Sequence, residues 1–259
     1  MYPRLRTAVA LGILLTARSI APAQAHFQEI LPSADVLPDG GEVTLDLVFT
    51  HPVEGAPVMQ MERPAEVGLM RGGERTDLSG ALVEGQTGGA TSWHLTQRLD
   101  EPGAAIFYVM PRPYWEPAEQ KYIVHYAKVV VDSYASGEGW DDLVGLPVEI
   151  APLTRPTGLW TGNVFTGVVL KGGSPVPFAE IEVEFVNDGG VTPPNDAFVT
   201  QVLKADANGT FTYAMPRAGW WGFAALIEGD APMTSPEGKE VPVEEGALIW
   251  IKATDMSGN

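Results

Sequence analysis

Apolar and polar residues alternate along several short segments of the chain with the period of a β-strand. Between residues 43 and 49 every second residue is Val, Leu or Phe, so one face of this strand is expected to be buried. The run 122–131 is apolar on both faces, which predicts a central strand. Further strands are expected near 92–99, 105–110, 164–170 and 179–186.

Three glutamates alternate with three apolar residues in the segment 179–186. This pattern predicts a strand with one buried face and one acidic face in solvent. The apolar positions are Ile181, Val183 and Phe185, and the glutamates are Glu180, Glu182 and Glu184.

Turn signals separate the predicted strands, and no long helical periodicity is found. The segment from Asp206 to Gly209 is typical of a hairpin turn, which predicts that strands 199–203 and 211–213 pair. Short strands at regular spacing indicate an all-β fold of two β-sandwich domains in tandem, with immunoglobulin-like or transthyretin-like architecture. A proline-rich stretch at 147–158 is the expected boundary, which gives domains at 26–153 and 157–256.

The first 25 residues have the pattern of a secretory signal peptide. Arg4 and Arg6 precede an apolar run at 7–17, and Ala23 and Ala25 place small residues at positions −3 and −1 of a cleavage site after Ala25. Cleavage after Ala23 satisfies the same rule. We therefore expect a signal peptide at 1–25 and an exported, periplasmic protein.

The net charge of the chain argues against nucleic acid as a partner and favours cations. The chain has 16 basic and 33 acidic residues, and loss of three arginines with residues 1–25 leaves 13 against 33, a charge of −20. Such a surface repels nucleic acid and raises the local concentration of cations. The chain has no cysteine, and we expect it not to be embedded in a membrane after cleavage, since no apolar run beyond residue 25 is long enough to span one.

The four histidines are the main candidates for binding a transition metal in a chain without cysteine. His51 ends the apolar row of strand 43–49, and His125 shares its strand face with apolar residues, so both are expected to be buried. His94 lies on a polar strand face and is expected to be in solvent.

His26 would carry a free α-amino group after cleavage at Ala25. The amine and one ring nitrogen of this residue can chelate a metal ion, and one further histidine would complete a three-nitrogen site, a histidine brace. Cleavage after Ala23 would instead leave His26 third from a free amine, which also chelates through amine, backbone and imidazole nitrogens. Both nitrogen sets suit divalent nickel or copper.

Long motifs occur across the chain, at 25–27, 49–55, 113–117, 122–131, 153–156, 160–165, 197–200 and 216–221. Together they resemble NikK, a periplasmic family, formerly of unknown function, that accompanies nickel energy-coupling-factor (ECF) transporters. The segment 167–213 also resembles the small transthyretin-like or carboxypeptidase-regulatory β-sandwich. The resemblance implies an accessory protein that binds nickel at His26, His51 and His125 and assists its uptake by a membrane transporter, an ECF-type nickel/cobalt permease.

Other functions stay open at this point. The ligand set also suits Co²⁺ and Cu²⁺, so the alternative is a copper-binding histidine-brace protein, either a copper chaperone or a monooxygenase-like oxidative enzyme. No hydrolase or nucleotide-binding motif is found, and we expect a binding protein rather than an enzyme. A plain adhesion or scaffold protein would retain no metal.

Overall fold

A computed structural model describes residues 26–55 and 57–256, and the predicted signal peptide lies outside this range. The fold is all-β, as expected, and the described residues form no α-helix, only two short 3₁₀ turns, η1 (Ser79–Ala81) and η2 (Asp196–Phe198). The strands are β1 (Phe27–Pro32), β2 (Val36–Leu37), β3 (Gly41–Thr50), β4 (Glu66–Arg71), β5 (Glu74–Asp77), β6 (Val83–Thr87), β7 (Ala90–Leu99), β8 (Gly103–Met110), β9 (Tyr114–Glu116), β10 (Lys121–Ser133), β11 (Val148–Pro152), β12 (Leu159–Trp160), β13 (Val164–Lys171), β14 (Ser174–Pro175), β15 (Glu180–Phe185), β16 (Gln201–Lys204), β17 (Thr210–Ala214), β18 (Gly219–Glu228), β19 (Met233–Thr234), β20 (Glu240–Val241) and β21 (Val243–Thr254).

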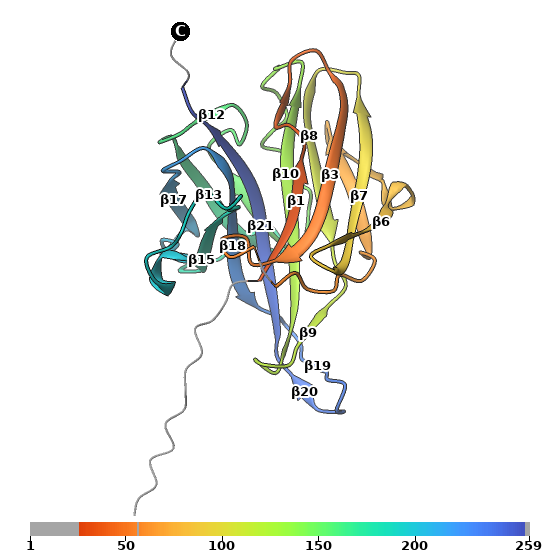
Figure 1. The fold of residues 1–259 in the computed structure, drawn as a ribbon, viewed down its shortest axis with the longest axis vertical. Helices are drawn as coiled ribbons and strands as arrows, with labels where there is room; N and C mark the ends of the chain where they lie inside the picture. Colours follow the sequence, from red (N-terminus) through yellow and green to blue (C-terminus); the bar gives the residue numbers. More distant parts are fainter. Residues whose placement is uncertain (1–25, 56, 257–259) are drawn as a thin grey trace, which may run out of the picture.

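One large sheet runs through both halves of the chain. Its strand order is β16-β15-β18-β21-β10-β8-β4-β5, and β2, β9 and β12 pair at its sides. The halves meet where β10 pairs in parallel with β21, from Tyr122 opposite Val243 to Val129 opposite Trp250. In Figure 1, β21 accordingly runs along the middle of the molecule, between the early strands and the late ones. The predicted strand 122–131 is therefore central, as its two apolar faces required.

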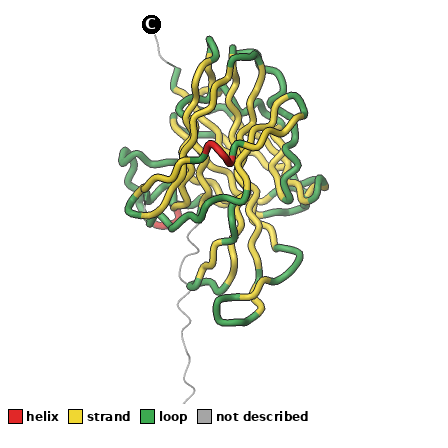
Figure 2. Tube along the Cα trace, turned by 90° about the vertical axis from the view of Figure 1, so that its right-hand side faces the viewer, coloured by secondary structure: helices red, strands yellow, loops and turns green. Residues whose placement is uncertain are grey.

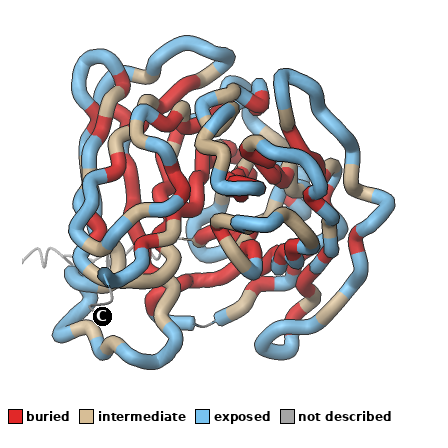
Figure 3. Tube along the Cα trace, turned by 90° about the horizontal axis from the view of Figure 1, so that it is seen from above, coloured by how far each residue is buried: buried red, intermediate tan, exposed pale blue. Residues whose placement is uncertain are grey.

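Two smaller sheets cover opposite faces of the large one. The sheet β1-β3-β7-β6 encloses one core with it, and the sheet formed by β11, β13, β14 and β17 encloses a second core. The side chains of β21 point alternately into the two cores. Leu248 and Trp250 pack in the first core, and Ile249 and Ile251 pack in the second. Figure 3 shows the buried residues gathered in the interior strands, with exposed loops around them.

Strands on the two sides of the predicted domain boundary pair with each other at two places. β11, on the N-terminal side of that boundary, pairs with β13, and β21 pairs with β10. The division into domains at 26–153 and 157–256 stays a prediction.

The prediction that the glutamates of β15 lie in solvent is wrong for two of them. Glu182 and Glu184 are 7% and 1% exposed, and Glu29 of β1 and Val53 of the turn after β3 lie close to Glu184. Glu184 accepts hydrogen bonds from Val53 N at 3.2 Å and from Thr200 Oγ1 at 2.5 Å. The carboxylate thus fastens the turn after β3, which a pattern within one strand could not reveal.

The predicted hairpin is also wrong. The turn itself forms, with Gly209 N donating to Asp206 O and Gly209 at a positive φ of 75°. However, β16 before the turn pairs with β15, whereas β17 after it pairs with β13 of another sheet. The turn therefore links two layers of the sandwich, and turn chemistry alone could not distinguish a link between sheets from a hairpin.

One end of the molecule extends beyond the main body. β9 and the two-stranded sheet of β19 and β20 lie there, below the body in Figure 1 and in the side view of Figure 2. Tyr122 Oη donates to Thr234 O at 3.2 Å and so ties this extension to β10. In the part of the chain that the structure describes, no helix is long and apolar enough to cross a membrane.

Candidate metal centre

Strand pairing at the start of β1 brings two of the predicted histidines together. Phe27 pairs with Thr50, so His26 and His51 lie at the same end of neighbouring strands. Their ring centroids are 4.7 Å apart. His51 is 3% exposed, which confirms its predicted burial at the end of the apolar row.

His125 approaches the same cluster from the large sheet. The Phe49 ring lies 5.6 Å from His26 and 6.1 Å from His125, measured between centroids, and meets His125 edge-on. His125 is also near enough to His26 to lower its pKa. The three histidines therefore share one neighbourhood, although they come from three different strands or strand ends.

A glutamate from the extension holds the His26 ring. Glu116 on β9 places Oε2 3.0 Å from His26 Nε2, and both side chains are 10% exposed. With Nε2 committed to this carboxylate, Nδ1 is the nitrogen that remains for a metal. Nδ1 is also the ring nitrogen that can chelate together with the amine of the same residue.

The environment of His26 keeps its imidazole neutral. Burial lowers the pKa of His26 to about 4, helped by repulsion from His51 and His125 and opposed by Glu116. At neutral pH the ring is consequently uncharged, which is the form that binds metal ions.

His125 is held in the same way by a second glutamate. Its Nε2 lies 3.2 Å from Glu244 Oε1, while its Nδ1 is buried without a hydrogen-bond partner among the described residues. Burial alone would raise the pKa of Glu244, but hydrogen bonds and charge attraction from His125 and Lys121 lower it to about 2. Glu244 is therefore an anion that fixes the ring orientation of His125.

A glycine of β21 makes the space for the His125 ring. A Cβ atom at Gly246 would lie 2.3 Å from His125 Cδ2, closer than any real contact. Gly246 pairs with His125 across the β10–β21 junction. The ring thus lies flat against the backbone of the neighbouring strand.

The two glutamates were missed by reasoning from the sequence. Glu116 lies within the aromatic motif 113–117, which pointed to this segment without assigning a role to the carboxylate. Glu244 is 119 residues from His125 in the sequence, and no spacing rule connects them. His94, in contrast, is exposed on β7, as its polar strand face predicted.

The described side chains do not form a complete metal site by themselves. No three His, Asp or Glu side chains within 26–55 and 57–256 are grouped so that they could hold a metal ion. The pattern does fit the surroundings of a metal-binding histidine, in which a carboxylate binds one ring nitrogen and leaves the other for the metal. His26 and His125 both show this pattern, and a further nitrogen ligand would have to come from outside the side chains.

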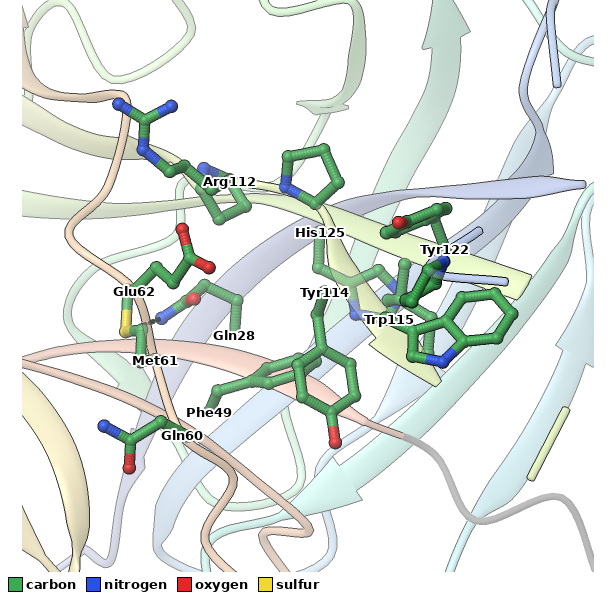
Figure 4. A pocket seen from close by; sticks show the side chains of 14 residues that line it. Gln28, Phe49, Gln60, Met61, Glu62, Arg112, Tyr114, Trp115, Tyr122 and His125 are labelled. Carbon is green, nitrogen blue, oxygen red and sulfur yellow. Dashed lines mark hydrogen bonds between the residues drawn. The ribbon is translucent and has the colours of Figure 1, made fainter. Parts of the chain in front are cut away.

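A cavity of about 440 Å³ opens beside the histidines. Phe49, Tyr114 and His125 form part of its wall (Figure 4). The Tyr114 ring also lies 6.0 Å from the His26 ring. The histidine cluster and the cavity are therefore neighbours that share residues.

Comparison with known proteins identifies a family but no characterised relative. The model of a family described as a domain of unknown function (DUF4198) matches residues 23–229. No curated protein matches the chain.

Solved structures show only a distant likeness. Trypsin-activated alpha-2-macroglobulin from Escherichia coli is 13% identical over 91% of this chain and 16% of its own length, with a TM-score of 0.24. A mutant of Salmonella alpha-2-macroglobulin is 14% identical over 89% of this chain and 15% of its own, with a TM-score of 0.29. The adhesin InvE of Yersinia pseudotuberculosis is 12% identical over 88% of this chain and 61% of its own, with a TM-score of 0.22. This chain spans only a small part of the macroglobulins, and none of these likenesses indicates a function.

Proposed function

The chain belongs to the DUF4198 family, and we propose that this protein is a periplasmic accessory protein that captures a divalent transition-metal ion, nickel, and assists its uptake by a membrane transporter. The metal is cargo in this proposal, and the protein is not an enzyme. The candidate ligands are His26, His51 and His125, and at least one of the last two binds the ion together with His26.

The observation that carries the proposal is the matched arrangement of two histidines. Glu116 and Glu244 each engage Nε2 of one ring, which leaves Nδ1 as the metal-facing nitrogen of His26 and of His125. A buried Nδ1 without a partner, as in His125, is unfavourable by about 1–3 kcal/mol unless something binds it. A metal ion would satisfy this atom.

The α-amino group of His26 supplies the nitrogen that the side chains lack. Cleavage after Ala25 would expose this amine next to the Nδ1 that Glu116 leaves available. Amine and ring nitrogen from one residue, with a nitrogen from His51 or His125, then make the three-nitrogen brace. The cleavage site lies outside the described residues and is part of the proposal.

The choice of nickel rests on the resemblance to NikK and its association with ECF transporters. The donor set itself also accepts Co²⁺ and Cu²⁺. Copper bound by the same brace is the alternative, and hydrogen peroxide formation by the copper-loaded protein would support an oxidative enzyme in place of a carrier.

Calorimetry with nickel on the processed protein tests the proposal. His26→Ala is expected to weaken binding by more than about tenfold, since it removes the ring nitrogen and leaves the α-amino group without its chelate partner. His94→Ala is the matched control, because this histidine is exposed on β7 and should leave the affinity unchanged. Equal nickel affinities for the wild type and His26→Ala would overturn the proposal.

A further inference from the structure

The cavity beside the histidines is larger than a metal ion needs. A water molecule occupies about 30 Å³ in the liquid, so an ion with six waters requires roughly 200 Å³. The cavity measures about 440 Å³, which lies within the range of about 300–1,000 Å³ for small organic ligands. The residues of its wall that bear on a ligand are Glu62, Arg112, Tyr114, Trp115, Tyr122 and His125.

Aromatic rings form much of its wall. The Trp115 and Tyr122 rings have their centroids 5.2 Å apart with their planes tilted by 55°, and Tyr114 packs edge-on against Phe49 at 5.1 Å. Figure 4 shows the tryptophan and tyrosine rings gathered on one side of the cavity and the side chains of Glu62 and Arg112 on the other. Such rings favour a ligand with a flat or apolar part, which a hydrated ion does not have.

The charges at the rim favour a ligand with both an anionic oxygen and an N–H donor. Arg112 and Glu62 are exposed, and neither forms a hydrogen bond or ion pair with another residue in the described part of the chain. One cation and one anion within a strongly acidic protein do not suit a polyanion such as citrate. They match a metal-bound amino acid, whose carboxylate keeps a second oxygen for Arg112 and whose coordinated amine keeps N–H groups that can donate to Glu62.

His125 connects this cavity to the metal centre. It lines the cavity, and its buried Nδ1 has no partner among the described residues. This inference rests on the proposed function. We propose that the metal arrives as a chelate with an amino acid, and that the cavity binds the amino acid while the histidines bind the ion. Arg112 then binds the chelate's carboxylate oxygen, and the rings of Trp115 and Tyr122 contact its side chain.

The test compares three forms of nickel by equilibrium dialysis and native mass spectrometry of the processed protein. The probes are Ni²⁺ alone, Ni²⁺ with isotope-labelled L-histidine, and Ni²⁺ with citrate. We expect L-histidine to be retained one-to-one with nickel and not to be retained without nickel. Arg112→Ala should weaken retention of L-histidine about tenfold while leaving the binding of Ni²⁺ alone unchanged, and Arg98→Ala, an exposed arginine on β7, is the matched control.

The outcomes separate this inference from the proposed function. Three results would each overturn the inference and leave the metal centre standing: nickel retained without L-histidine in the arm that supplies both, citrate retained with nickel, or L-histidine retained without nickel. Loss of nickel binding in all three arms would overturn the proposed function itself.

Discussion

Glu29 is expected to make this protein less stable as the pH rises from acidic to neutral. The side chain lies on β1 and is 7% exposed. Burial, followed by repulsion from Glu184 and Asp46, raises the pKa of Glu29 to about 8. Replacement by Gln, which is never charged, removes this dependence and nearly preserves the shape.

The magnitude follows from linkage between protonation and folding. A raised carboxyl pKa means that the unfolded chain ionises first, so stability is highest below about pH 4.5 and falls as pH rises toward 8. At pH 7, which lies 2.5 pH units above the ordinary pKa of 4.5 and below the folded pKa of about 8, ionisation of Glu29 in the unfolded chain favours unfolding by ~3.5 kcal/mol, at about 1.4 kcal/mol per pH unit. Glu29→Gln should therefore stabilise the protein by up to ~3.5 kcal/mol at pH 7 and by almost nothing at pH 4.

Urea unfolding of the wild type and Glu29→Gln at pH 4.5, 6 and 7.5 measures this difference. Glu42→Gln, an exposed position on the adjacent β3, is the control and should show no such trend. Because Glu184 repels Glu29, a double replacement with Glu184→Gln should gain less than the sum of the two. An advantage of Glu29→Gln that is equal at pH 4.5 and 7.5 would refute the reasoning.

Three further substitutions test the site and the core. Glu244→Gln should weaken nickel binding about 10–100-fold by calorimetry with little change in fold, because it loosens the ring of His125; an unchanged affinity would contradict the role of Glu244. Gly246→Ala should displace that ring and lower both nickel affinity and melting temperature, since its Cβ would lie 2.3 Å from the ring; a variant that binds like the wild type would show that the ring is not held there. Lys128→Met should lower the free energy of unfolding by about 3–5 kcal/mol, measured in urea at neutral pH, because it leaves the buried Glu149 without its ion partner. In the wild type the two charged groups lie 2.6 Å apart. No loss of stability would mean that the pair contributes nothing.

Alternation along single strands predicted the fold class and the burial of two histidines. The segments 43–49 and 122–131 lie within β3 and β10, and His51 and His125 are buried as their strand faces required. Such patterns report which face of a strand is apolar. They do not report what lies on the other face, and for that reason Glu184 was expected in solvent.

The candidate site depends on contacts that only the folded chain makes. Glu116 and Glu244 reach their histidines through β9 and β21, and β21 lies more than 100 residues from β10 in the sequence. The neighbourhood of His26 and His51 follows from the register of β1 on β3, which the sequence did not specify. Residue types thus indicated the metal-binding candidates, and pairing between distant strands decides how they are oriented.

The parallel pairing of β10 with β21 also has a consequence for the order in which the chain is made. Residues 243–254 are synthesised long after His26 and His125, yet they supply Glu244 and the space at Gly246 against which the His125 ring rests. A partly synthesised chain that ends before β21 would carry all three candidate histidines without the support for one of them. In the proposed function, His125 would therefore be held for metal binding only after the last strand of the central sheet has emerged and paired.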